Sequence, residues 1–191
     1  MVELAEAKEL IKLTRDSINA YFSGKELKIN DELKKTFSDK RGCFVTLTID
    51  GELRGCIGFP EPVFPLYKAI VDAAKSAAFS DPRFSPLTEE EFKDVSVEIS
   101  VLTKPELVKV GKAEDYLKKI KVGEDGLIIR GTYGSGLLLP QVFKEYNCDA
   151  KQALEMTCQK AGLSPDAWMD LSNKIYKFQA QIFSEENGKV Y

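Results

Sequence analysis

Apolar residues recur at helical spacing in the first part of the chain. One stripe holds Leu4, Ile11, Ile18 and Phe22. This spacing predicts a helix over residues 3–23, and Gly24 supplies a stop signal directly after it. A shorter helix is predicted near residues 31–37, with Asn30 or Asp31 at its start.

The pattern changes to a period of two residues beyond position 42. The run "CFVTLTI" is followed by Asp50 and Gly51 and then by "ELRGCIG", which predicts a β-hairpin with a type I′ turn. Small and apolar residues in "PLYKAIVDAAKSAAF" then predict a closely packed helix, and "DVSVEISVLT" predicts a returning strand. Its alternation places Val95, Val97, Ile99 and Val101 inward and Ser96, Glu98 and Ser100 outward.

The second half of the chain repeats this order of elements. "DGLIIRGTYGSGLLL" predicts a hairpin, "CDAKQALEMTCQKAG" a helix and "KIYKFQAQIFSE" a closing strand. We expect one domain over residues 1–191, with a duplicated β-β-α-β unit over 42–102 and 126–183 and a connecting segment over 103–122. The expected fold class is α+β, a largely antiparallel sheet flanked by helices. The alternative is that α+β segments look alike at this level without being copies.

Composition narrows the classes of function. The chain has 30 acidic and 27 basic residues, a net charge of −3, and no basic run interleaved with aromatic residues, which disfavours binding to nucleic acid or to an anionic membrane. Its start lacks the order of a signal peptide, and "GTYGSGLLLPQVF" is too short and too broken to span a bilayer. We therefore expect a cytoplasmic protein. Abundant Lys and Glu are typical of thermophiles.

Cysteine and histidine usage excludes several chemistries. The chain has four cysteines, none in a C-x-x-C motif, and no histidine. Catalysis by Ser-His-Asp or Cys-His arrangements and histidine-based metal sites are therefore excluded. We expect free thiols, no metal site and no cofactor.

An Arg-Gly-Cys sequence occurs twice in the first hairpin. With a two-residue turn at Asp50-Gly51, Val45 is expected opposite Cys56. Three candidate residues then share one face of the hairpin: Cys43, Arg54 and Cys56. A guanidinium group beside a thiol favours the thiolate, so Cys56 is a candidate nucleophile and Arg54 its activator. The alternative is that both cysteines are small core residues and that Arg54 only holds a loop.

Further candidate residues surround this pair. Gly55 and Gly58 leave backbone uncovered, either for close packing or for a ligand. The second hairpin has Tyr133, Gly134 and Ser135 at the matching place, so only the glycine is shared, and Arg and Cys in one copy alone indicate a site there.

Charged residues near this hairpin are also candidates. In the loop "SDPRFSPL", Asp81 and Pro82 form a helix-ending turn, and Arg83 either binds an anion or pairs with Glu98. Glu98 either pairs with an arginine or acts as a base. The remaining binding candidates are Arg41, Cys43 and Ser100.

The ordered blocks "RGCFVTL", "GELRGCIG", "SDPRF", "VEISVLT", "GLLLPQV" and "KAGL" resemble the AMMECR domain family. The resemblance covers nearly the whole chain and includes the signature hexapeptide Leu53 to Gly58. It implies an α+β fold with a duplicated unit and a cytosolic setting in archaea or bacteria. It also implies a signature region at Arg54, Gly55, Cys56 and Gly58, with Asp81, Arg83 and Glu98 as its neighbours. It does not imply a known reaction.

Three functions are open at this point. The resemblance implies association with Memo-type proteins and radical SAM enzymes, and hence a modification pathway in which Cys56 acts on a small molecule or a protein partner. The alternative is a non-catalytic module that docks a partner protein. A nucleic-acid-associated regulator is the third reading, which the charge disfavours. Whether the protein is an enzyme, and its oligomeric state, are open.

Overall fold

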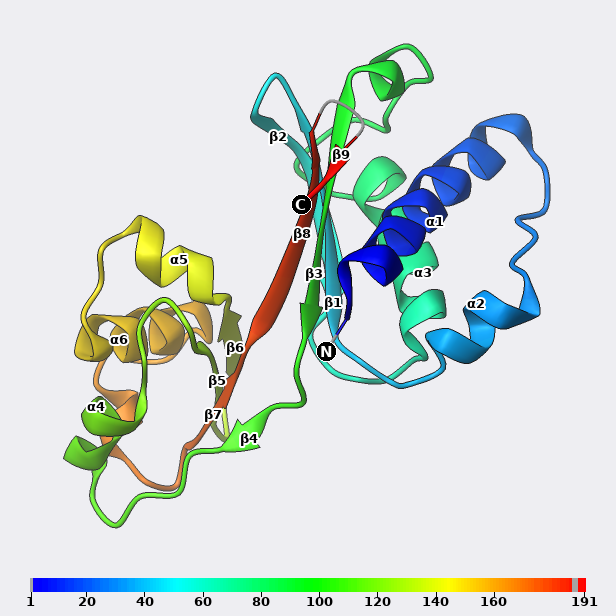
Figure 1. Ribbon diagram of the computed structural model, residues 1–191. Coiled ribbons are helices and arrows are strands. Elements are labelled where there is room, and N and C mark those ends of the chain that lie inside the picture. Colours follow the sequence, from blue (N-terminus) through cyan, green and yellow to red (C-terminus); the bar gives the residue numbers. More distant parts are fainter. Residues whose placement is uncertain (1, 187–188) are drawn as a thin grey trace. The chain divides into compact units, whose positions relative to one another are not determined.

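A computed structural model describes residues 2–186 and 189–191 of the chain (Figure 1). The chain divides into two compact units. The first comprises Met1–Leu102 together with Gln181–Tyr191, and the second comprises Thr103–Ala180. The mixture of helices and antiparallel strands confirms the α+β class.

The first unit is a sheet covered by helices on one face. Its strand order is β2-β1-β3-β8-β9, with β1 (Cys43–Ile49), β2 (Glu52–Phe59), β3 (Val95–Leu102), β8 (Ala180–Glu186) and β9 (Lys189–Val190). The helices are α1 (Leu4–Ser23), α2 (Asp31–Thr36), α3 (Leu66–Phe79) and the 3-10 turn η1 (Glu91–Lys93). Figure 1 shows α1 and α3 along the same face of the sheet. The inward residues of β1 and β3 join these helices in one apolar core.

Local signals set the ends of these elements. Glu3 and Glu6 form a capping box at the start of α1, and Gly24 ends it with φ of 62°. Asn30 caps α2 through a hydrogen bond that its side chain accepts from the Leu33 amide. Both residues of the hairpin turn have positive φ, 51° at Asp50 and 81° at Gly51, as a type I′ turn requires.

The second unit has a smaller sheet and its own core. Its strand order is β4-β7-β5-β6, with β4 (Glu106–Leu107), β5 (Gly126–Arg130), β6 (Ser135–Leu138) and β7 (Lys174–Phe178). The helices are α4 (Tyr116–Lys119), α5 (Pro140–Glu145) and α6 (Ala150–Lys160), with 3-10 turns η2 (Ala113–Asp115) and η3 (Ala167–Met169). Buried residues such as Phe143, Leu154 and Trp168 form this core.

The two sheets share a strand arrangement. In each, a hairpin is followed by a helix and by a strand that returns to pair with the first strand, giving β2-β1-β3 and β6-β5-β7. Internal duplication stays a prediction that agrees with this order.

The expected boundaries of the segments shift in two places. Residues 103–122 belong to the second unit, and the predicted strand from Lys174 breaks after Phe178, so that β8 joins the first sheet.

Helices in the described part of the chain do not reach the combination of length and apolar character that crossing a bilayer needs.

Candidate functional site

The first hairpin has an irregular register that decides which residues share a face. Thr46 pairs with Cys56 and Leu47 with Gly55, but Thr48 pairs with Leu53, which leaves Arg54 as an extra residue in β2. The expected pairing of Val45 with Cys56 is therefore wrong by one residue. A shift of one residue moves a side chain to the other face of the sheet.

Cys43 and Cys56 consequently lie on opposite faces of the sheet. Cys43 is fully buried in the core beneath the helices, and burial raises the pKa of its thiol to about 12. Cys56 is half-buried and stands beside Thr46 on the other face. The expectation that Cys43, Arg54 and Cys56 project together is wrong, and Cys43 is a core residue.

Arg54 is held by a carboxylate from η1. Its Nε and Nη2 donate to the two carboxylate oxygens of Glu91 at 3.0 and 3.1 Å, and its guanidinium lies 5.8 Å from the centre of the Phe84 ring. Glu91 also forms a capping box with Thr88. Hydrogen bonds from Arg54 and then from Thr88 lower the pKa of Glu91 to about 2. Arg54 therefore connects β2 to the segment before β3.

Asp81 and Arg83 instead clamp the main chain of Cys56. The Asp81 side chain is 1% exposed and accepts hydrogen bonds from the Cys56 amide at 2.9 Å and from the Arg83 amide, Nε and Nη2 at 3.1, 2.9 and 2.7 Å. Arg83 Nη2 also donates to the Cys56 carbonyl at 3.2 Å. Hydrogen bonds, first of all from Arg83, hold the pKa of Asp81 well below its usual range. Because β2 is an edge strand, this ion pair satisfies backbone groups that no neighbouring strand reaches.

The thiol of Cys56 accepts one hydrogen bond and lies near the side chain of Arg83. Thr46 Oγ1 donates a hydrogen bond to its Sγ at 3.3 Å. The pKa of Arg83 is raised above its ordinary value chiefly by its hydrogen bonds to Asp81 and by the charge of Asp81. The Cys56 side chain raises this pKa further, to a smaller extent. The guanidinium beside the thiol is therefore that of Arg83, from the loop after α3, and not that of Arg54.

Glu98 lies in the same cross-strand row as Cys56. Thr46 pairs with Cys56 on β2 and with Glu98 on β3, so the three side chains share one face. Burial raises the pKa of the Glu98 carboxyl group. Of the two alternatives for Arg83, the pairing with Glu98 is wrong, because Arg83 pairs with Asp81. Ser100 follows two residues after Glu98 on the same face and is 2% exposed.

The glycines of the hairpin serve packing. A Cβ at Gly55 would overlap the carbonyl oxygen of Ala77 in α3, and one at Gly58 would overlap the backbone of β1 at Cys43. The second hairpin repeats the first of these contacts, because a Cβ at Gly134 would overlap the carbonyl oxygen of Ala161. Of the two readings for Gly55, close packing is the one that this geometry favours.

The structure thus places Asp81 and Arg83 in direct contact with the main chain of Cys56. Glu98 lies in the same cross-strand row as Cys56, because Thr46 pairs with both residues. Arg41 is half-buried in the residues just before β1. The sequence did not predict that Thr46 is the cross-strand neighbour of Cys56, because the bulge in β2 changes the pairing. Sequence reasoning also missed Glu91 as the partner of Arg54, because the two residues are 37 positions apart in the sequence.

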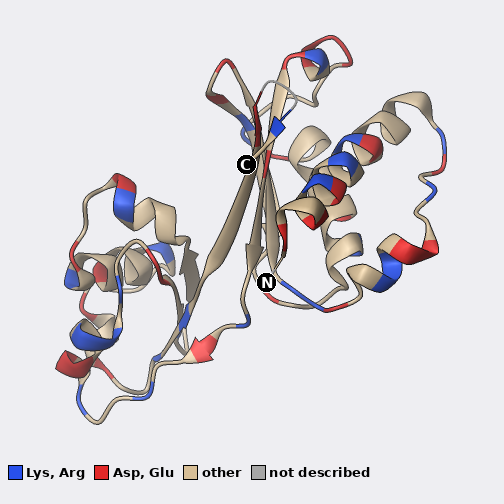
Figure 2. Cartoon of the chain, in the orientation of Figure 1, with Lys and Arg blue, Asp and Glu red and all other residues tan. Residues whose placement is uncertain are grey.

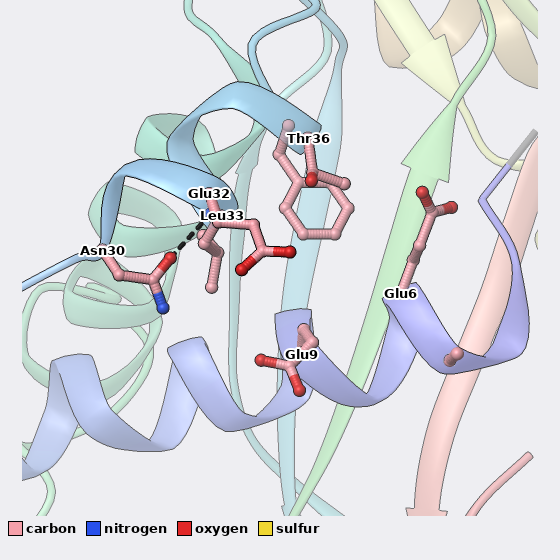
Figure 3. A pocket seen from close by; sticks show the side chains of 8 residues that line it. Glu6, Glu9, Asn30, Glu32, Leu33 and Thr36 are labelled. Carbon is pink, nitrogen blue, oxygen red and sulfur yellow. Dashed lines mark hydrogen bonds between the residues drawn. The ribbon is translucent and has the colours of Figure 1, made fainter.

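A cavity of about 400 Å³ lies between α1 and α2 (Figure 3). Glu6, Glu9 and Glu32 make its lining acidic. The Glu6 carboxylate already accepts from the Glu3 amide, and Asn30 caps α2. Within residues 2–186 and 189–191, no group of three or more Cys, Asp or Glu side chains is arranged to hold a metal ion. The described residues that line this cavity therefore do not form a metal site.

Comparisons with known proteins agree with the fold. The AMMECR1 family profile matches residues 11–183. Protein MJ0810 of Methanocaldococcus jannaschii is 49% identical over 187 residues, which cover 97% of this chain and 92% of that protein. A Methanothermobacter thermautotrophicus protein is 50% identical over 182 residues, covering 95% of each chain.

A solved structure extends the match to three dimensions. The crystal structure of uncharacterized protein PH0010 from Pyrococcus horikoshii has a TM-score of 0.91 and 43% sequence identity, and the match covers 100% of this chain and 97% of that one. The sequence and structural matches both extend over almost the full length. The chain therefore belongs to the AMMECR1 family.

Proposed function

We propose that this protein uses the Cys56 thiol as a nucleophile toward a small molecule or a partner protein. The observation that carries the proposal is the set of contacts on Cys56. Its amide and carbonyl are fixed by Asp81 and Arg83, and its Sγ accepts a hydrogen bond from Thr46. A positioned thiol beside a guanidinium is the arrangement that favours a thiolate.

Each residue has a separate part in this chemistry. Arg83 supplies positive charge beside the sulfur, Asp81 orients Arg83, and Thr46 donates to the lone pairs of Sγ. The thiol proton leaves to solvent, and the thiolate electron pair forms a bond to an electrophilic carbon. The group previously bound to that carbon then departs with the electron pair of the broken bond. This is transfer of an acyl or alkyl group to sulfur, with Cys56 as catalyst or as acceptor.

Comparison of the two hairpins argues against a purely architectural role for Cys56. Gly55 and Gly134 make the same close approach to a helix carbonyl, so the glycine accounts for the shared packing. The residue after the glycine is Cys56 in the first hairpin and Ser135 in the second. Ser135 is exposed, whereas Cys56 is half-buried and in contact with Thr46. The close packing that both hairpins share therefore depends on the glycine and does not need the thiol of Cys56.

The cellular setting is part of the same proposal. A reducing cytoplasm keeps the thiol free, in agreement with four unpaired cysteines. The partners suggested by resemblance, Memo-type proteins and radical SAM enzymes, would supply or receive the transferred group in a modification pathway.

Competitive alkylation of the native protein tests the proposal. Limiting iodoacetamide is added between pH 6 and 9, and the label on each cysteine is counted by mass spectrometry. Cys148 is the matched control, because it is half-buried like Cys56 but contacts the sulfur of Met156 at 3.3 Å. Cys56 is expected to label faster than Cys148 and much faster than the buried Cys158. Equal labelling of Cys56 and Cys148 would contradict the proposal and favour a docking module, because a docking surface has no need of a reactive thiol.

A further inference from the structure

Glu98 is a carboxylate that the fold leaves unpaired. It is half-buried at the centre of the sheet, on the strand next to β1. Its side chain forms no hydrogen bond or ion pair within residues 2–186 and 189–191. Removal of a carboxylate from water without a partner is costly, and burial accordingly raises the pKa of this group. A functional ligand would supply the missing partner.

The surroundings of Glu98 define what kind of ligand fits. We name the polar face as the side of the first sheet that carries Thr46, Thr48, Cys56, Ser96, Glu98 and Ser100. Ser100 is 2% exposed, and its hydroxyl has no hydrogen-bond partner in the described part of the chain. Glu98 and Ser100 therefore offer two unused polar groups on adjacent outward positions of one strand.

Among the paired outward positions of β1, β2 and β3, the charge on the polar face is negative and comes from Glu98. The paired outward positions of β1, β2 and β3 there are Thr, Ser, Cys, Gly, Phe and Leu apart from Glu98, and Figure 2 shows the central strands of this sheet largely without charged residues. The guanidinium of Arg83, at the edge of the sheet, is already paired with the buried Asp81. An anionic ligand would meet an unpaired carboxylate, whereas a cationic one would neutralise it.

We infer that the site takes a small ligand with a primary amine, whose ammonium group binds Glu98 and Ser100 while its electrophilic carbon faces Cys56. Cys56 and Glu98 are separated by one strand, so their Cα atoms lie about 10 Å apart and their side chains reach a ligand only a few bonds long. The inference rests on the proposed nucleophilic role of Cys56 and adds the chemical class of the substrate.

Methanethiosulfonate reagents of different charge test the inference. The Cys56 thiolate attacks the sulfenyl sulfur, a disulfide forms, and methanesulfinate leaves with the electron pair of the broken S–S bond. The cationic reagent carries a 2-(trimethylammonium)ethyl group, the anionic one a 2-sulfonatoethyl group, and the neutral one a methyl group. The cation-to-anion rate ratio at Cys56 is divided by the same ratio for N-acetylcysteine amide, which removes the intrinsic reactivity of the reagents.

The corrected ratio is expected to be about tenfold in favour of the cation, from one unit charge at about 8 Å in a partly solvated site. Glu98→Gln should bring it close to one, because the amide keeps the shape and removes the charge. The control Glu9→Gln removes an equal charge from the exposed side of α1 and should leave the ratio unchanged. The wild-type ratio is informative by itself, even if Glu98→Gln were to fold poorly.

The outcomes separate the two proposals. If Cys56 reacts no faster than Cys148 with the neutral reagent, the nucleophilic role fails. If Cys56 is reactive but its corrected ratio is one or favours the anion, the amine inference is overturned and the nucleophilic role stands. An unchanged ratio in Glu98→Gln would likewise overturn the assignment of Glu98 as the amine-binding group.

Discussion

Arg83→Gln should slow the reaction of Cys56 with a neutral thiol reagent. The guanidinium lies beside Cys56, donating to its carbonyl at 3.2 Å, and its side chain is 53% exposed. A unit charge at about 5 Å with an effective dielectric constant of about 40–80 stabilises a thiolate by about 0.8–1.7 kcal/mol. Loss of the guanidinium removes this stabilisation of negative charge on the sulfur.

The observed rate falls by less than the lost electrostatic stabilisation alone would give, which is about four- to seventeenfold. A thiolate that is harder to form is also a stronger nucleophile, and this compensation recovers about half of the effect on a logarithmic scale. The net expectation is about a two- to fivefold slower reaction of Cys56 with methyl methanethiosulfonate at pH 7. The uncharged reagent avoids electrostatic steering, and site-resolved mass spectrometry gives the rate for Cys56 alone.

Two further variants make this prediction specific. Arg83→Lys keeps a positive charge near the sulfur and should retain much of the rate. Arg54→Gln removes the guanidinium that is bound to Glu91, and should change the rate by less than about 1.5-fold because that guanidinium contacts Glu91 and Phe84 rather than Cys56. Urea unfolding confirms that each variant is folded. An unchanged rate in Arg83→Gln, or an equal loss in Arg54→Gln, would refute the assignment of Arg83 as the thiolate-stabilising group.

Three other substitutions or conditions have defined outcomes. Asp81→Asn should lower the free energy of unfolding by about 2–3 kcal/mol in urea titrations at pH 7, because a buried acceptor of four N–H groups is lost. The pKa of Asp81 is lowered by folding, so this stabilisation is present above about pH 4 and is lost on further acidification; a constant difference down to pH 2 would contradict it. Cys43, whose pKa burial raises to about 12, should stay unlabelled by iodoacetamide until the protein unfolds, and labelling at the rate of Cys56 would show the burial to be wrong. Gly55→Ala should cost about 3 kcal/mol or more through its clash with α3, whereas Gly111→Ala, which meets nothing within 4 Å, should stay within about 0.5 kcal/mol; calorimetry compares the two.

Local sequence determined most of the secondary structure of this protein. The Asp50-Gly51 turn, the Gly24 helix stop and the inward alternation of Val95, Val97 and Ile99 are all found where the pattern predicts them. Such features depend on φ preferences and on side-chain period, which are properties of a few neighbouring residues. The first hairpin and its following loop could also be chosen from the sequence as the candidate site, because chemically active residue types gather there.

Tertiary structure alone decided how the site is assembled. One extra residue in β2, Arg54, reverses the face on which Cys56 lies, and no local signal in the sequence marks this bulge. The positive charge beside Cys56 comes from Arg83, 27 residues further along the chain, because the loop after α3 folds back onto the edge of β2. The pairing of Arg54 with Glu91 and the lack of a partner for Glu98 in the described chain follow from the same long-range placement. Spacing along a sequence fixes which residues are near neighbours on a helix or strand, but contacts between distant segments depend on register and loop path, which only the folded chain defines.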